Sequence, residues 1–125
     1  MKILIAEDEP LTLLALEQHL KSTGYDVITA TDGRDALNKL QAFSPQLIIT
    51  DIMMPFTSGL ELIGIIRSSY RQEIPIIVLS AIDEEDTVME AFMLGANDFI
   101  TKPFDPQELS LRVKRLSDMN QLTEA

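Results

Sequence analysis

The chain has 125 residues, 46% hydrophobic and 24% charged, so it is long enough to close one core and is neither disordered nor fibrous. It has no cysteine, which excludes disulfides, thiolate metal sites and cysteine nucleophiles. Its formal net charge of −10 repels nucleic-acid phosphates, and no apolar stretch approaches the roughly 20 residues that a bilayer requires. We therefore expect a cytoplasmic protein that binds neither nucleic acid nor membrane directly, with one domain over 1–120 and a tail or linker start over 121–125.

The first half of the chain alternates short apolar runs with segments of helical periodicity. We expect strands over 2–6 and 26–30, a third strand ending at Asp51, and helices over about 10–23 and 34–43. Gly24 should end the first of these helices, and Pro45 breaks the second. The run from Leu47 to Thr50 has no polar alternation, which is typical of a central parallel strand covered on both faces.

The second half continues the same alternation. We expect strands over 75–80 and 98–101, and helices beginning at Ser58-Gly59, at Glu84 and after Asp105. Gly95 should close the second of these helices at Leu94. Asp105 is a helix cap, followed by Pro106 at the first helical position, and this last helix should run to about Met119.

Five strands alternating with five helices predict an α/β fold. We expect a flavodoxin-like, doubly wound (βα)5 domain with a parallel sheet in the order 2-1-3-4-5 and helices on both faces. In that order the first and third strands are neighbours, and ligands bind in the crevice at their carboxyl ends.

Polar side chains follow four of the predicted strands, where a purely structural core would not need them. Glu7 and Asp8 follow the first strand, Asp51 ends the third, Ser80 ends the fourth, and Lys102 follows the fifth. Three carboxylates in one crevice repel each other: two unit charges about 5 Å apart cost roughly 3 kcal/mol at an effective dielectric of about 20. Either a carboxyl group is protonated or a cation binds there.

The chemistry of these side chains favours Mg²⁺ and a phosphoryl group. All the acidic donors are hard oxygens and no His or Cys lies near them in the chain, which favours Mg²⁺ over zinc. The ammonium of Lys102 and the hydroxyl of Ser80 suit phosphoryl oxygens. An aspartate beside a divalent cation can act as a nucleophile towards a phosphoryl donor, so Asp51 is a candidate to form an aspartyl phosphate.

The combined pattern resembles the receiver domain of two-component response regulators. It reads Glu7-Asp8, Asp51-x-Met53-Met54-Pro55-x-x-x-Gly59, Ser80-Ala81 and Lys102-Pro103, and it covers nearly the whole chain. The resemblance implies that a histidine kinase or phosphotransfer protein phosphorylates Asp51 in a Mg²⁺-dependent reaction. It implies Asp8 and Asp51 as metal ligands, Glu7 acting mainly through water, and the backbone carbonyl of Met53 as a further ligand.

The resemblance also implies a signalling switch rather than an enzyme acting on other molecules. Lys102 would pair with the phosphoryl group, and its peptide bond to Pro103 would be cis. Ser80 and Phe99 would form the switch pair and would alter an output surface made by the fourth helix, fifth strand and fifth helix. An output domain or effector protein is the implied target of that surface.

Some positions depart from one branch of that family, whose winged-helix transcription factors dimerise through this surface. Asp98 and Arg112 match one of the charge pairs of such a dimer, but Glu90 stands where a basic residue would face Glu108. A phosphorylation-dependent homodimer therefore stays open. Separately, Met53 and Ile82 flank the expected phosphoryl position, and neither can orient an attacking water, which predicts slow loss of the phosphoryl group.

Other readings of the same residues stay open at the level of sequence. The acids at 7–9 could simply favour a helix N-terminus, and Asp51 could be a turn cap. A Mg²⁺-dependent phosphohydrolase with an aspartyl nucleophile would share the fold class, but it would normally have a second acid where Met53 stands. A protein-interaction module that is never phosphorylated is the remaining alternative.

Overall fold

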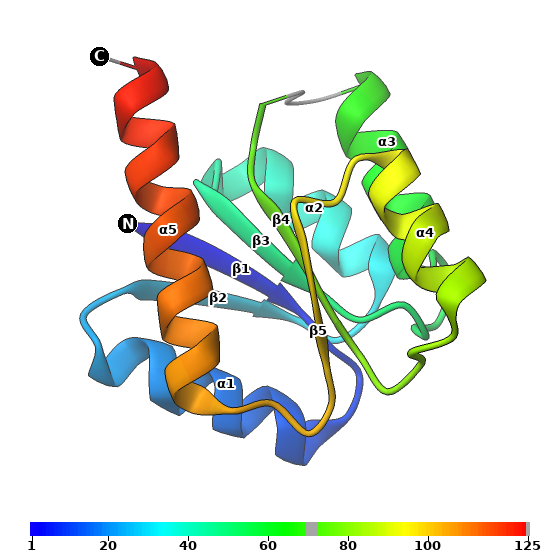
Figure 1. Ribbon diagram of the computed structural model, residues 1–125, viewed down its shortest axis with the longest axis horizontal. Coiled ribbons are helices and arrows are strands. Elements are labelled where there is room, and N and C mark those ends of the chain that lie inside the picture. The colour runs from blue at the N-terminus through cyan, green and yellow to red at the C-terminus, as the bar shows by residue number, and fades with distance from the viewer. Residues whose placement is uncertain (70–72, 125) are drawn as a thin grey trace.

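The fold alternates five strands and five helices along the chain (Figure 1). The computed structural model describes residues 1–69 and 73–124. The elements in chain order are β1 (Lys2–Ala6), α1 (Pro10–Ser22), β2 (Asp26–Ala30), α2 (Gly33–Phe43), β3 (Leu47–Thr50), α3 (Gly59–Ser69), β4 (Ile76–Ser80), α4 (Glu85–Leu94), β5 (Asp98–Thr101) and α5 (Pro106–Glu124).

The five strands form one parallel sheet in the order β2-β1-β3-β4-β5, which confirms the predicted doubly wound topology. The register places Ala6 of β1 level with Ala30 of β2 on one side and with Thr50 of β3 on the other. The carboxyl ends of β1 and β3 therefore lie side by side, at the same end of the parallel strands. This end is where the predicted acidic residues follow the strands.

Helices cover both faces of the sheet, and alternate strand residues supply the two halves of the core (Figure 1). Ile3 and Ile5 of β1 pack with buried residues of α1 and α5, whereas Leu4 and Ala6 pack with residues of α2, α3 and α4. β3 and β4 divide their side chains in the same way, so their continuously apolar sequences are explained by burial on both faces. No helix in the described part of the chain is both long and apolar enough to span a membrane.

The ends of the helices and strands agree with the predicted ones to within one residue, except at the end of α5. Gly24 has φ 99° directly after the C-cap of α1, and the Asp105 carboxylate accepts a hydrogen bond from the Gln107 amide at the start of α5. β3 ends at Thr50, one residue before the predicted end. α5 continues to Glu124 rather than stopping at Met119, because no Gly or Pro interrupts it after Met119.

The predicted tail over 121–125 is therefore helical as far as residue 124. That these residues begin a linker stays a prediction. Ala125 lies outside the described residues.

Candidate functional site

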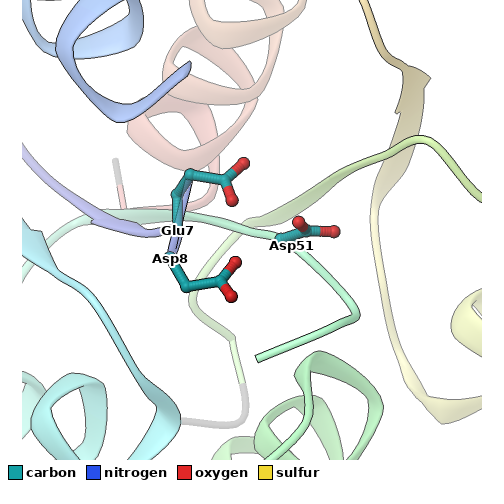
Figure 2. A group of neighbouring side chains, drawn as sticks. All are labelled: Glu7, Asp8 and Asp51. Atoms are coloured by element: carbon teal, nitrogen blue, oxygen red, sulfur yellow. The ribbon is translucent and has the colours of Figure 1, made fainter. Parts of the chain in front are cut away.

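Two neighbouring strand ends bring the three acidic side chains together (Figure 2). The Asp51 amide donates to the Ala6 carbonyl at 3.0 Å, so Asp51 begins its loop beside the point where Glu7 and Asp8 leave β1. Each of the three side chains offers one carboxylate oxygen, and these oxygens lie within 4.8 Å of one another. The parallel register, rather than nearness in the chain, creates this acidic pocket.

The members of the acidic pocket differ in their access to water. The exposed fraction of Glu7 is 1% and that of Asp51 is 7%, whereas Asp8 is exposed. Burial raises the pKa of Glu7 to about 7, and the nearby charge of Asp51 acts in the same direction. Without a metal ion, Glu7 is therefore partly protonated near neutral pH, while Asp8 supplies the side of the pocket that faces solvent.

Lys102 joins the pocket from the loop after β5. Its Nζ atom lies 2.5 Å from Glu7 Oε1 and 2.8 Å from Asp51 Oδ2. Burial alone would lower the pKa of Lys102, but its bonds to the two carboxylates outweigh burial and raise the pKa. The backbone places the ammonium: the Lys102 amide donates to the Ser80 carbonyl, and the Lys102–Pro103 peptide bond is cis, as the resemblance implied.

The carboxylate of Asp51 is held on both of its oxygens. Oδ1 accepts the Ile52 amide at 2.6 Å, and Oδ2 accepts Lys102. Behind it, Gly59 packs so closely that an added Cβ would lie 1.9 Å from the Asp51 carbonyl oxygen, and the Gly59 amide donates to the Ile52 carbonyl. Sequence reasoning missed these roles of Ile52 and Gly59. The one sequence signal of the close approach is the run of small residues Thr57, Ser58 and Gly59.

The two predicted switch residues, Ser80 and Phe99, differ in their burial. Ser80 is buried at the end of β4, and its Oγ accepts a hydrogen bond from the Ile82 amide at 3.1 Å. Phe99 of β5 is half-buried and packs against the core half formed with α2, α3 and α4. The hydroxyl of Ser80 is thus engaged locally in this structure, and the Phe99 ring is only partly inserted.

Two apolar side chains complete the surroundings. Met53 follows Asp51 by two residues with its side chain 65% exposed, and Ile82 follows Ser80 and is half-buried. Neither carries a group that accepts or donates a strong hydrogen bond. The polar chemistry of the site therefore comes from Glu7, Asp8, Asp51 and Lys102, which the structure brings together as predicted.

The donor set suits a hard divalent cation. The pocket offers carboxylate oxygens only, its oxygens are close enough to share one ion, and Asp8 leaves it open to solvent. Mg²⁺ prefers such oxygen donors, keeps several waters and binds through one or two carboxylates. The arrangement can thus hold a cation beside one constrained carboxylate and one ammonium, which is a setting for phosphoryl chemistry.

Comparison with known proteins gives matches along almost the whole chain. A family model of the response regulator receiver domain matches residues 3–114. The chain is 42% identical over 115 residues to the alkaline phosphatase synthesis transcriptional regulatory protein PhoP of Bacillus subtilis (strain 168). That match covers 92% of this chain and 48% of the relative, so the chain spans about half the length of this curated protein.

Solved structures give the same result. The receiver domain of the Francisella response regulator 1452 is 32% identical with a TM-score of 0.89, and the match covers 95% of this chain and 98% of that one. The signal receiver domain of a signal transduction histidine kinase from Syntrophus aciditrophicus is 36% identical with a TM-score of 0.84, covering 92% and 88%. The fold described above is thus found both in a response regulator and in a histidine kinase.

Proposed function

This chain belongs to the response regulator receiver domain family, and on that premise we propose that Asp51 is its phosphoryl acceptor. The observation that carries the proposal is the position of the Asp51 carboxylate, which lies close to the carboxylates of Glu7 and Asp8 and accepts a hydrogen bond from the ammonium of Lys102. A receiver domain is a signalling domain. The chemistry that we propose for it is confined to gaining and losing its own phosphoryl group.

The same pocket is our proposed site for Mg²⁺. Asp8 and Asp51 would bind the ion directly, Glu7 would act mainly through water, and the backbone carbonyl of Met53 would supply a further oxygen. When bound, Mg²⁺ would neutralise the clustered carboxylates and shield the oxygens of the incoming phosphoryl group. The convergence of carboxylate oxygens supports these assignments.

The transfer step that we propose uses a phosphohistidine as donor. An oxygen of the Asp51 carboxylate attacks phosphorus, the P–N bond to the donor imidazole breaks, and the imidazole leaves as the aspartyl phosphate forms. Lys102 now contacts Asp51 Oδ2 and would move its contact to a phosphoryl oxygen. The Ile52 amide keeps Oδ1 in place during the exchange.

The signal would pass from the phosphoryl group to the output surface through Ser80 and Phe99. A phosphoryl group brings up to about two negative charges and three acceptor oxygens. If the Ser80 hydroxyl donates to one of these oxygens, it leaves the Ile82 amide, the β4–α4 loop moves, and the Phe99 ring turns inward. Such couplings are typically worth about 1–3 kcal/mol, enough to shift populations by about 5–150-fold.

We propose a histidine kinase or phosphotransfer protein in the cytoplasm as the phosphoryl donor. An output domain or effector protein would read the face formed by α4, β5 and α5, and direct binding to nucleic acid or membrane is not part of the proposal. The domain would comprise residues 1–120, with 121–125 as a tail or the start of a linker. A homodimer formed on phosphorylation is compatible with this function but is not required by it.

The test is to incubate the protein with Mg²⁺ and acetyl phosphate and to measure intact mass. We expect one added phosphoryl group on the wild type and none on Asp51→Asn, which keeps the shape of the side chain. Asp26→Asn is the matched control, because it removes an exposed carboxylate at the opposite end of the sheet and should still be modified. Beryllofluoride with Mg²⁺ should shift the NMR signals of α4, β5 and α5.

Three outcomes would contradict the proposal. Modification of Asp51→Asn would place the acceptor elsewhere, and an unmodified wild type would favour an interaction module that is never phosphorylated. Catalytic turnover of phosphate esters by the wild type, lost in Asp51→Asn, would instead indicate a phosphohydrolase.

A further inference from the structure

The loop between β3 and α3, residues 51–58, contains a phenylalanine in an unfavourable place. Phe56 has φ 69°, in the left-handed region that bulky residues rarely adopt, and its side chain is 68% exposed. An exposed ring gains little from burial, and a Gly or Asn would fit this backbone without strain. Neither core packing nor turn geometry therefore explains a phenylalanine at this position.

One contact does explain it. The guanidinium carbon of Arg34, in the first turn of α2, lies 4.2 Å from the centroid of the Phe56 ring. This distance is well inside the range of an attractive cation–π interaction, which Arg forms more often than Lys. The contact joins two segments that follow different strands, because Arg34 comes after β2 and Phe56 after β3.

Two further contacts fix the same pair of segments. The Gly33 amide donates to the Pro55 carbonyl at 3.3 Å, and a Cβ on Gly33 would lie 2.1 Å from the Thr57 carbonyl oxygen. Only glycine permits this approach of α2 to the β3–α3 loop. The start of α2 thus contacts three consecutive loop residues, Pro55 to Thr57. In the contact between Arg34 and Phe56, both residues contribute a side chain.

The loop held in this way begins at the acidic pocket. Directly after Asp51, Ile52 donates its amide to Asp51 Oδ1, and the Ile52 carbonyl accepts the Gly59 amide. Met53, whose carbonyl is proposed above as a metal ligand, is the next residue. The conformation of the loop therefore fixes the positions of two backbone groups. One is the Ile52 amide, which donates to Asp51, and the other is the Met53 carbonyl, which is proposed as a ligand of the ion.

We propose that Arg34 and Phe56 are a positioning pair that holds the β3–α3 loop in the conformation that binds the divalent cation. Neither residue touches the pocket, and both act through the loop backbone. The inference rests on the proposed function, because it needs a metal ion bound beside Asp51. A site arranged before binding loses less conformational freedom when the ion arrives, so loss of the pair should weaken binding.

The measurement is Mg²⁺ affinity, followed by NMR on the amides of residues 51–53 at constant pH. We expect Arg34→Met and Phe56→Leu each to weaken binding two- to fivefold, which corresponds to about 0.4–1 kcal/mol. Arg34→Lys and Phe56→Tyr keep a cation over a ring and should bind Mg²⁺ like the wild type. The double variant Arg34→Met/Phe56→Leu should be no weaker than either single one, because both remove the same contact.

Electrostatics alone predicts the opposite sign for Arg34→Met. Removing a positive charge near an acidic pocket would strengthen cation binding, so a weaker affinity distinguishes positioning from simple charge. Phe43→Leu is the matched control. It removes another partly exposed ring that lies under a cation, since Lys2 Nζ is 5.9 Å from the Phe43 centroid, but at the far end of α2 and away from the pocket.

The results separate this inference from the proposed function. If the wild type binds Mg²⁺ and both Arg34→Met and Phe56→Leu bind it equally well, the positioning pair is wrong and the proposed function stands. A lower melting temperature with unchanged affinity would also overturn the pair, since it shows a purely structural contact. If the wild type binds no Mg²⁺, the proposed function fails first and the pair fails with it.

Discussion

Glu7 is a buried residue of the acidic pocket, and its charge depends on its surroundings. Burial raises its pKa to about 7, above the ordinary value of 4.5 that applies in the unfolded chain. Between these two values the folded protein binds more protons than the unfolded one. The free energy of unfolding of the metal-free protein should therefore fall as pH rises from about 4.5 to 7, by up to about 1.4 kcal/mol per pH unit for one proton.

The variant Glu7→Gln tests this dependence. An amide has no charge to desolvate, so the free energy of unfolding of the variant should fall much less as pH rises. At pH 8 the variant should be more stable than the wild type by about 1–3 kcal/mol. Urea unfolding in EDTA at several pH values measures the difference. Parallel pH profiles for the two proteins would show that Glu7 is not the titrating group.

At the same scale of single residues, we expect Met53 and Ile82 to affect the lifetime of the proposed phosphoryl group. Neither side chain can orient an attacking water, so we expect slow hydrolysis. Met53→Glu supplies a carboxylate two residues after Asp51 and should raise the rate of phosphoryl hydrolysis about tenfold. This increase is smaller than the rate enhancement that a well-placed general base gives. Met53→Leu is the control and should change little.

The loss of the phosphoryl group can be followed by intact mass after acetyl phosphate is removed and Mg²⁺ is retained. A half-life of seconds in the wild type would contradict the prediction of slow hydrolysis.

At the scale of elements, Arg67 connects three parts of the fold. It lies in the last turn of α3 and donates hydrogen bonds to the carbonyls of Ile74 and Gly95 and to the side chain of Asn97. Asn97 in turn accepts the Ile76 amide at the start of β4. The guanidinium thus ties α3 to the end of α4 and to β4.

Arg67→Met should therefore lower the free energy of unfolding by about 2–3 kcal/mol, because half-buried carbonyls lose a charged donor. Chemical denaturation measures the loss. Arg115→Met is the matched control: Arg115 also bonds a carboxylate, that of Asp98, but its side chain is 57% exposed, and its loss should cost less than about 1 kcal/mol. Equal losses of unfolding free energy in Arg67→Met and Arg115→Met would show that the hydrogen bonds of Arg67 contribute no more to stability than an exposed ion pair does.

The output face, α4 with β5 and α5, shows a second relation between elements. Asp98 of β5 is buried and pairs with Arg112 and Arg115 of α5 within one chain. Arg112 also pairs with Glu108 one turn earlier. The charges that the resemblance assigns to a dimer are therefore already partnered inside the monomer, and a dimer through this face would have to exchange these pairs.

At the scale of the whole molecule, we expect the excess of acids to give Mg²⁺ a measurable effect on stability. The chain carries a formal net charge of −10, and three of its carboxylates converge in one pocket. An ion that binds only the folded state stabilises it by about 2.7 kcal/mol at one hundred times its dissociation constant. We expect Mg²⁺ to raise the melting temperature more than NaCl does at the same ionic strength.

Asp8→Asn controls for general screening of charge. It should remove most of the specific gain from Mg²⁺ and leave the effect of NaCl, which acts on the whole surface. If Mg²⁺ and NaCl at matched ionic strength give the same melting temperature in the wild type, the pocket holds no ion of useful affinity.

Much of the fold and of the acidic pocket could be predicted because their signals are local. Continuous apolar runs indicated β3 and β4 as buried strands, and caps such as Asp105 located helix starts within one residue. The predicted end of α5 at Met119 was wrong, since the residues after it carry no stop signal and the helix continues to Glu124. The contact of Arg34 with Phe56 was also missed, because its partners belong to different loops and neither residue type is unusual alone.

The order of residues by itself determined which chemistry this protein can carry: hard oxygens and one ammonium, each placed directly after a strand. Only the tertiary structure decided which of them meet and in what state. Parallel pairing of β1 with β3 brings Asp51 beside Glu7 and Asp8, and burial then raises the pKa of Glu7. Distances and desolvation depend on the packed surroundings of a group, and packing is a property of the whole fold rather than of any segment.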